Sequence, residues 1–142
     1  MIPHSILIVS VLATFSPAIA QPRTITGKVT HVRDGDTIEV NGVPIRLDGL
    51  HAPELHEPGG HAARAWMVRA TAGRVVVCHL TGERTRDRNV GRCYVGGADL
   101  AAGLISSGLA RDCARYSGGR YRALEAPAAA TMTLPSYCVR RR

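Results

Sequence analysis

The sequence predicts an α+β fold in which a small five-stranded β-barrel carries about three helices. Five short segments have the residue pattern of strands, and a helical pattern follows the third of them. Two further helical patterns lie toward the C-terminus. We see no internal repeat and no composition shift that would separate two domains, so the elements are expected to share one modest core.

The first three strands are expected to form a meander. Thr24–Val32 alternates β-branched and polar residues, as a half-buried strand does. The next two segments, Asp36–Val40 and Val43–Leu50, flank Asn41-Gly42. An Asn-Gly pair is the strongest short hairpin signal because both turn positions need a positive φ.

A helix is expected within residues 57–73, because apolar residues recur there at helical spacing and Gly73 can end it. Two more strands follow, Arg74–Leu80 and Gly91–Gly97. The arginine-rich segment between them, residues 81–90, is expected to be a loop. Near the C-terminus, one helix is expected from about Asp99 to Gly108.

A last helix is expected to start near Ser117 and to be interrupted by Pro127, and the tail that follows it is expected to be irregular. Five short strands, a helix after the third and helices at the end together predict a closed barrel of the OB type. Such a barrel offers one face to a nucleic-acid-sized ligand.

The N-terminus has the features of a secretory signal peptide. Residues 6–15 form an apolar run that is followed by Pro17 and by Ala18-Ile19-Ala20, a small-residue cleavage pattern. An uncleaved membrane anchor is the alternative, although the run is short for a spanning helix. We therefore expect residues 1–20 to be a signal peptide and residues 21–142 to be a single secreted or periplasmic domain.

The formal net charge is +7, and all but one of the 18 basic residues are arginine. The arginine side chain is a planar fork that can bind phosphate or carboxylate through two hydrogen bonds. This charge favours an anionic partner, with nucleic acid as the first candidate and an acidic surface polymer as a weaker one.

The four cysteines all follow the predicted signal peptide, and an even number in an exported domain indicates two disulfides. Three pairings are possible. The expected strand arrangement favours Cys78–Cys93 and Cys113–Cys138.

Several side chains suited to phosphodiester chemistry are expected at one end of the barrel. Cleavage needs a base that takes a proton from water and positive charge aimed at the phosphorus oxygens. Asp34 and Asp36 leave a turn into the second strand, Arg46 lies across the hairpin, Glu54 follows the third strand, and Arg92 lies on the fifth. Hairpin geometry can bring these groups together.

The motifs "DGDTIEV", "IRLDGLHAPE", "DRNVGR" and "ADLAAGLISSGLA", in this order, resemble the staphylococcal nuclease (thermonuclease) family of exported phosphodiesterases. The similarity extends over nearly all of residues 21–142. The resemblance implies an OB-type barrel, calcium dependence and hydrolysis of both DNA and RNA, without strong sequence specificity.

The resemblance also implies roles for single residues. Asp36 matches a metal-ligating aspartate, and Asp34 matches an acid that supports the metal through water. Arg46 and Arg92 match two phosphate-binding arginines, and Glu54 matches the general base. A nuclease of this kind is expected to act as a monomer with no stable membrane association after processing.

His51 departs from the family pattern, because the "HAPE" segment has an imidazole where a second metal carboxylate is usual. Calcium prefers six to eight oxygen ligands. The Ala52 carbonyl can still contribute an oxygen. Three outcomes follow: weak calcium binding, use of manganese, zinc or nickel, which accept imidazole, or loss of catalysis with retention of nucleic-acid binding.

Further residues are expected to bind the nucleic-acid chain. Arg84, Arg86 and Arg88 can follow the phosphate backbone, and Tyr116 can stack on a base. The "DRNVGR" segment is one residue longer than the usual family form and lacks its tyrosine. The two function hypotheses are therefore a metal-dependent nuclease and a noncatalytic exported nucleic-acid-binding module.

Overall fold

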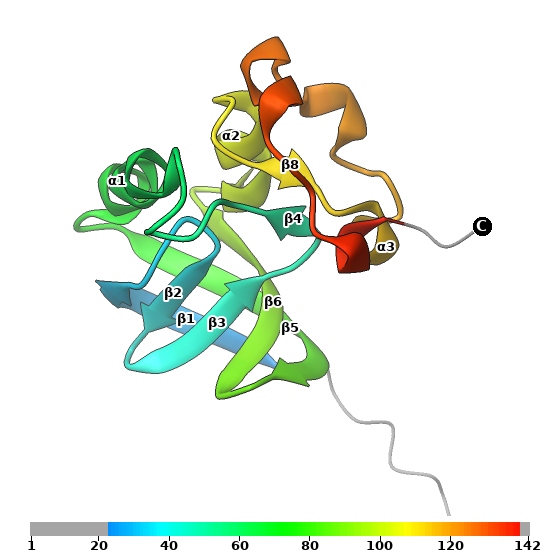
Figure 1. The fold of residues 1–142 in the computed structure, drawn as a ribbon. Helices are drawn as coiled ribbons and strands as arrows, with labels where there is room; N and C mark the ends of the chain where they lie inside the picture. The colour runs from blue at the N-terminus through cyan, green and yellow to red at the C-terminus, as the bar shows by residue number, and fades with distance from the viewer. Residues whose placement is uncertain (1–22, 140–142) are drawn as a thin grey trace, which may run out of the picture.

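The computed structural model describes residues 23–139, so the predicted signal peptide, residues 1–20, lies outside the described part. Figure 1 shows the elements in chain order. The strands are β1 (Thr24–Val32), β2 (Thr37–Val40), β3 (Val43–Leu47), β4 (Leu50–His51), β5 (Val75–Thr85), β6 (Arg88–Val95), β7 (Ala98–Asp99) and β8 (Arg111–Asp112). The α-helices are α1 (Gly60–Thr71), α2 (Leu100–Ser106) and α3 (Ala114–Ser117).

The main sheet closes on itself. Its strand order is β3-β2-β1-β5-β6-β7, and β3 also pairs with β6. All neighbouring pairs are antiparallel except β3 and β6, which run parallel. Five long strands thus form the ring that the sequence predicted, and the α+β class with an OB-type barrel is confirmed.

The hairpin between β5 and β6 is longer than expected. The prediction that residues 81–90 form a loop was wrong, because β5 continues to Thr85 and β6 begins at Arg88. Thr85 pairs with Arg88 across a tight turn in which Arg86 has a φ of 56°. The polar composition that suggested a loop instead belongs to a solvent-exposed hairpin that projects beyond the barrel (Figure 1).

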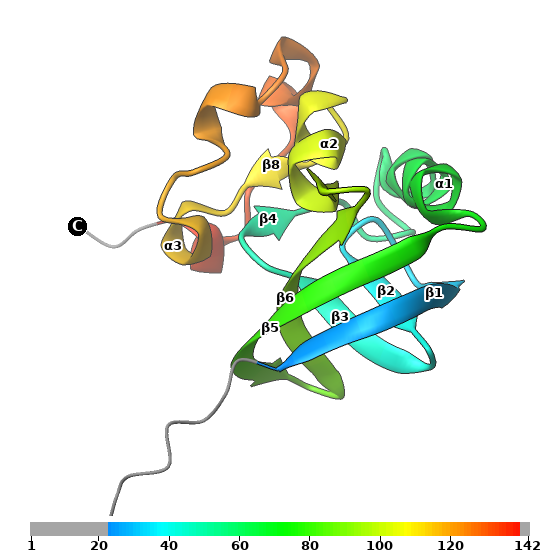
Figure 2. The same cartoon turned by 180° about the vertical axis from the view of Figure 1, so that it is seen from behind.

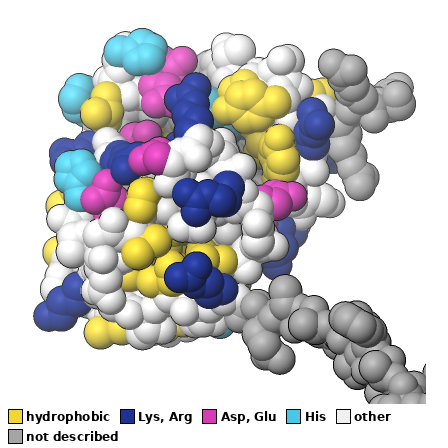
Figure 3. Space-filling model, turned by 90° about the horizontal axis from the view of Figure 1, so that it is seen from below, with side chains coloured by type: hydrophobic (Ala, Val, Ile, Leu, Met, Phe, Trp, Pro, Cys, Tyr) yellow, Lys and Arg dark blue, Asp and Glu magenta, His cyan; other side chains and the backbone are white. Residues whose placement is uncertain are grey.

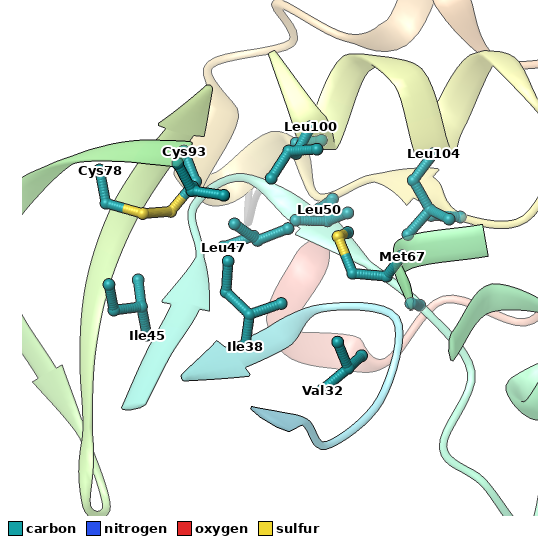
Figure 4. Close-up of a cluster of buried hydrophobic side chains, with 14 of the residues drawn as sticks. Val32, Ile38, Ile45, Leu47, Leu50, Met67, Cys78, Cys93, Leu100 and Leu104 are labelled. Carbon is teal, nitrogen blue, oxygen red and sulfur yellow. A yellow bond between two sulfur atoms is a disulfide. The ribbon is translucent and has the colours of Figure 1, made fainter. Parts of the chain in front are cut away.

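The core fills the barrel and the space beneath α1 and α2. Ile38, Ile45, Met67 and Leu104 are fully buried in it, as Figure 4 shows. The disulfide between Cys78 and Cys93 also lies there, and it joins directly opposed residues of β5 and β6. The interior therefore consists of medium-sized aliphatic side chains and one covalent link between strands.

The C-terminal segment packs over one end of the barrel rather than forming a long helix (Figure 2). The predicted last helix is wrong: the chain after Ser117 forms 3₁₀ turns η1 (Arg122–Leu124), η2 (Pro127–Thr131) and η3 (Ser136–Cys138). Gly118 and Gly119 have φ values of 68° and 88°, which no right-handed helix contains. A second disulfide, Cys113–Cys138, ties η3 to the start of α3.

A second small sheet, β4 paired with β8, joins this C-terminal segment to the chain that leaves the barrel. Within residues 23–139, no helix is long and apolar enough to cross a membrane.

Figure 3 shows arginine and lysine side chains spread over one face among hydrophobic side chains, with most of the visible acidic and histidine side chains gathered to one side.

Candidate active site

A cleft of about 840 Å³ lies between β3, the β5–β6 hairpin, α3 and η3. This volume is in the usual range for ligand pockets. Its lining is dominated by arginines, with acids and two tyrosines among them. The charged and aromatic lining residues are Arg33, Arg46, Arg84, Arg86, Arg88, Asp34, Asp48, Glu54, Glu83, Tyr116 and Tyr137.

Asp36 is a buried carboxylate, with 3 % of its surface exposed. It does not itself line the cleft, and neither do His51 and Ala52, but its ion-pair partner Arg46 does. Its Oδ1 accepts a hydrogen bond from Thr37 Oγ1 at 3.0 Å, and its Oδ2 lies 3.2 Å from Arg46 Nη1. The backbone N–H of Ala52 donates to Oδ2 at 3.4 Å. A buried charge is costly unless it is paired, and these contacts supply the pairing.

Arg46 lies on the outer face of β3, opposite Thr37 of β2. Its Nη1 donates to the Leu47 carbonyl at 3.1 Å, and its Nη2 donates to the Leu50 carbonyl at 3.2 Å. A guanidinium has five N–H donors, so these bonds and the Asp36 ion pair fix its orientation without using all of them. Arg46 therefore presents a fixed positive charge to the cleft.

Asp34 stabilises the turn that precedes Asp36. Its Oδ1 accepts the backbone N–H of Asp36 at 3.0 Å. Burial, with a smaller contribution from the charge of Asp36, raises the pKa of Asp34 to about 7. The negative charge of Glu54 acts in the same direction, so three carboxyl groups share one small region.

Glu54 lies in the exposed turn that connects β4 to α1 and lines the cleft. Its backbone N–H donates to Glu57 Oε2 at 2.7 Å, and a Cβ at Gly60 would collide with its carbonyl oxygen. The turn is therefore tightly built against the start of α1. Among the described residues, no hydrogen bond or ion pair holds the Glu54 carboxylate, so it is available to a ligand.

His51 is buried on β4, where it pairs with Arg111 of β8, and 7 % of its surface is exposed. Burial lowers its pKa, opposed by the charge of Asp36 and assisted by that of Arg46. Its Nδ1 has no hydrogen-bond partner among residues 23–139. The side chain thus has an unpartnered buried nitrogen, and burial disfavours its charged form.

The sequence suggested Asp36, His51 and the Ala52 carbonyl as metal ligands. Within residues 23–139, no three acidic, histidine or cysteine side chains converge on one point. An ion held by Asp36, His51 Nδ1 and the Ala52 carbonyl would have a mixed nitrogen and oxygen donor set, the kind that manganese, zinc or nickel accept. Calcium would lack the carboxylate oxygens that it prefers.

Arg88 and Arg92, both on β6, lie differently with respect to the cleft. Arg92 donates from Nε to Asp48 Oδ2 at 3.2 Å and does not line the cleft. The residue paired with Arg46 across the parallel β3–β6 ladder is Val90. Arg88 lines the cleft, and its Nη1 donates to Thr37 Oγ1 at 2.9 Å.

The other predicted nucleic-acid contacts also line the cleft. Arg84 and Arg86 come from the hairpin, and Tyr116 comes from α3 on another wall. Four of the charged and aromatic lining residues were missed from the sequence: Arg33, Asp48, Glu83 and Tyr137. The tail that contains Tyr137 had been expected to be irregular. The only sequence signal that could have placed Tyr137 near the cleft was its position next to Cys138.

Comparison with known proteins agrees with this architecture. The model of the family described as staphylococcal nuclease homologue matches residues 44–131, which is more than half of the chain. The chain is also 32 % identical over 127 residues to the succinoglycan biosynthesis protein ExoI of Rhizobium meliloti (strain 1021). That alignment covers 81 % of this chain and 65 % of the relative, so the chain spans about two thirds of that protein's length.

Proposed function

Because the chain belongs to the staphylococcal nuclease homologue family, we propose that it is a phosphodiesterase that hydrolyses DNA or RNA in the arginine-lined cleft. One observation carries the proposal. The ion pair between buried Asp36 and partly buried Arg46, with 3.2 Å between Oδ2 and Nη1, adjoins a cleft that is also lined by Glu54, whose carboxylate is unpaired among the described residues. A fixed cation and a free base at one place are what phosphodiester hydrolysis needs.

In this proposal the Glu54 carboxylate takes a proton from a water whose oxygen attacks phosphorus in line. A new P–O bond forms as the bond to the leaving oxygen breaks, and the leaving oxygen takes a proton from solvent. Arg46 stabilises the charge that grows on the nonbridging oxygens. Its orientation is fixed before the reaction by two carbonyls and Asp36, so little reorganisation is needed.

The second guanidinium is assigned here to Arg88. Arg88 lines the cleft, and it donates a hydrogen bond to Thr37, the residue that follows Asp36 in the sequence. The resemblance to the family suggested Arg92, whose Nε is engaged by Asp48. Asp48 also accepts from Arg120 Nη2 at 3.0 Å, so Arg92 belongs to a neighbouring ion-pair network.

Asp36, His51 Nδ1 and the Ala52 carbonyl are the groups that would hold a divalent ion, with Asp34 in the outer shell. Such an ion would supply positive charge to a phosphate oxygen and would lower the pKa of a bound water. Manganese, zinc and nickel are the candidates that these donors favour.

The test is a cleavage assay on purified, oxidised protein that lacks residues 1–20. Single-stranded DNA and RNA are incubated with chelator, calcium, manganese, zinc or nickel, and the products are separated on a denaturing gel. We expect fragments with a borderline ion and weaker cleavage with calcium. Intact strands under every condition would overturn the nuclease proposal.

A noncatalytic nucleic-acid-binding module is the second candidate. The imidazole at position 51 favours it, because it removes a carboxylate from the donor set. The observation expected for this alternative is a salt-sensitive gel shift without cleavage at any ion. Two disulfides are typical of an oxidising compartment, and we propose that either protein would act as a monomer in the periplasm or outside the cell.

A third, weaker candidate is binding of an acidic polysaccharide, which the arginines of the cleft favour. The Rhizobium meliloti relative carries the name of a succinoglycan biosynthesis protein, which is compatible with a glycan ligand. Competition experiments separate it from the other two. If heparin displaces a labelled ligand from the cleft and oligonucleotides do not, the result would favour an acidic polysaccharide as the natural ligand. Displacement by oligonucleotides at equal charge would favour nucleic acid.

A further inference from the structure

Two tyrosine rings lie on the same side of the cleft although they are distant in sequence. Tyr116 belongs to α3 and Tyr137 belongs to η3, and both line the cleft. Their side chains are 47 % and 44 % exposed. Two half-exposed aromatic rings in a cleft rich in arginine are typical of a site that stacks planar ligand groups.

The Cys113–Cys138 disulfide holds these two rings in place. Cys113 immediately precedes α3, and Cys138 is the last residue of η3. Figures 1 and 2 show α3 and η3 side by side. Each element is about one turn long and too short to be stable alone. The covalent link between them is buried, with both cysteines 1 % exposed.

Tyr137 also lies near His51, one of the proposed metal ligands. Its ring centroid is 6.5 Å from that of His51, and the two rings are nearly perpendicular at 80°. The ring of Tyr116 is contacted by its neighbour Arg115, whose guanidinium carbon lies 5.8 Å from the ring centroid. Tyr137 has no cation partner of this kind among the described residues, so its ring is open to a ligand.

We propose that Tyr137, fixed by the Cys113–Cys138 disulfide, forms with Tyr116 a base-binding wall that selects single-stranded nucleic acid. The arginines of the β5–β6 hairpin, on another wall, then contact the phosphates of the same strand. Bases in a duplex are stacked on one another and cannot reach the rings, whereas those of a single strand can. The inference rests on the proposed function in one respect, that nucleic acid occupies the cleft.

The experiment measures binding in chelator by fluorescence anisotropy, with a gel check that the probes stay intact. The probes are a labelled single-stranded DNA, a duplex of the same sequence, and a strand of equal length whose residues are abasic. We expect the native protein to bind the normal strand more tightly than the abasic strand. Tyr137→Ala should weaken binding of the normal strand by about 5- to 150-fold and leave the abasic strand unaffected.

Three variants make the test specific. Tyr137→Phe keeps the ring and should bind like the native protein. Tyr94→Ala removes a tyrosine that does not line the cleft, and it should have no effect. The double variant Cys113→Ser/Cys138→Ser keeps both rings but frees η3, and it should lose the preference for the normal strand while still binding the abasic one.

Equal affinity of the native protein for the normal and abasic strands would overturn the inference, and so would an unchanged Tyr137→Ala variant. Either result leaves the proposed nuclease intact if the cleavage assay is positive. Conversely, loss of base-dependent binding in Tyr137→Ala supports the inference even if no strand is cleaved. If Tyr137→Ala weakens binding of an acidic polysaccharide as strongly as that of the normal strand, the rings recognise sugars and the inference is wrong.

Discussion

Val90 of β6 lies directly across from Arg46 of β3 in the parallel pairing that closes the barrel. An aliphatic side chain therefore occupies the place beside the buried cleft arginine, and a charged residue lies two positions away on either side. On one side Arg88 reaches Thr37, and on the other Arg92 reaches Asp48. Arg88 and Arg92 share one face of β6, so their positions along the strand separate the arginine that lines the cleft from the one that contacts Asp48.

Replacement of Arg88 should therefore affect catalysis more than replacement of Arg92. Loss of one preorganised donor to a developing oxyanion typically lowers kcat by about 100- to 1000-fold, and we expect that loss for Arg88→Ala. Arg92→Ala should change kcat by less than about tenfold because Arg92 is not among the residues that line the cleft. Steady-state cleavage of a labelled oligonucleotide measures both. If Arg92→Ala lowers kcat more than Arg88→Ala does, Arg92 and not Arg88 is the second guanidinium that stabilises the transition state.

Replacement of Glu54 should separate binding from cleavage. Glu54→Gln removes the proposed base, and we expect a rate about 100- to 10000-fold lower with the oligonucleotide Kd nearly unchanged. Glu83→Gln is the matched control, since Glu83 also lines the cleft but comes from the hairpin. If Glu54→Gln cleaved at the native rate, another group would have to accept the proton.

Restoring a carboxylate at position 51 should change the ion preference. We expect His51→Asp to bind calcium at least about tenfold more tightly, because a carboxylate adjoining a cation contributes more than about 1.4 kcal/mol at protein-like dielectric. Isothermal titration with calcium and with zinc measures the change. The control is His56→Asp, which adds the same charge at an exposed position of the nearby turn. An equal gain in both variants would indicate a general charge effect.

The hairpin arginines should make binding depend on salt. For single strands, log K is expected to fall with log salt concentration with a slope of about −0.7 for each phosphate neutralised. Arg84→Gln and Arg86→Gln should therefore each make the slope shallower by about 0.7 without changing sequence preference. Anisotropy titrations at several salt concentrations measure the slope, and Arg69→Gln on α1 is the control. If both variants keep the native slope, the phosphates of the nucleic acid do not contact Arg84 or Arg86.

The disulfide within the barrel should stabilise the fold. Cys78 and Cys93 are separated by 15 residues, and closing a loop of that length is expected to contribute roughly 2 to 4 kcal/mol. Cys78→Ala/Cys93→Ala should lower the free energy of unfolding by about that amount, as measured by urea denaturation. A change below about 1 kcal/mol would mean that strand pairing alone holds β5 against β6.

Much of the fold could be predicted from local pattern because each signal had a local cause. The Asn41-Gly42 turn has the positive φ values, 50° and 76°, that its residue types favour. Asp99 caps α2 by accepting the backbone N–H groups of Ala101 and Ala102, at the place where the helix was expected to start. The extension of the β5–β6 hairpin into residues 81–90 and the last helix were predicted wrongly. Polar composition and apolar spacing do not report pairing between distant segments.

The sequence by itself determined the barrel, the cysteines available for cross-linking, and the acids and arginines from which the candidate site is built. Tertiary structure alone decided that Arg88 rather than Arg92 lines the cleft, that His51 Nδ1 is buried with no partner among residues 23–139, and that the Tyr137 ring lies near the His51 ring. The physical reason is that strand register and the docking of a distant tail depend on packing between segments far apart in the chain. No local residue pattern encodes such contacts.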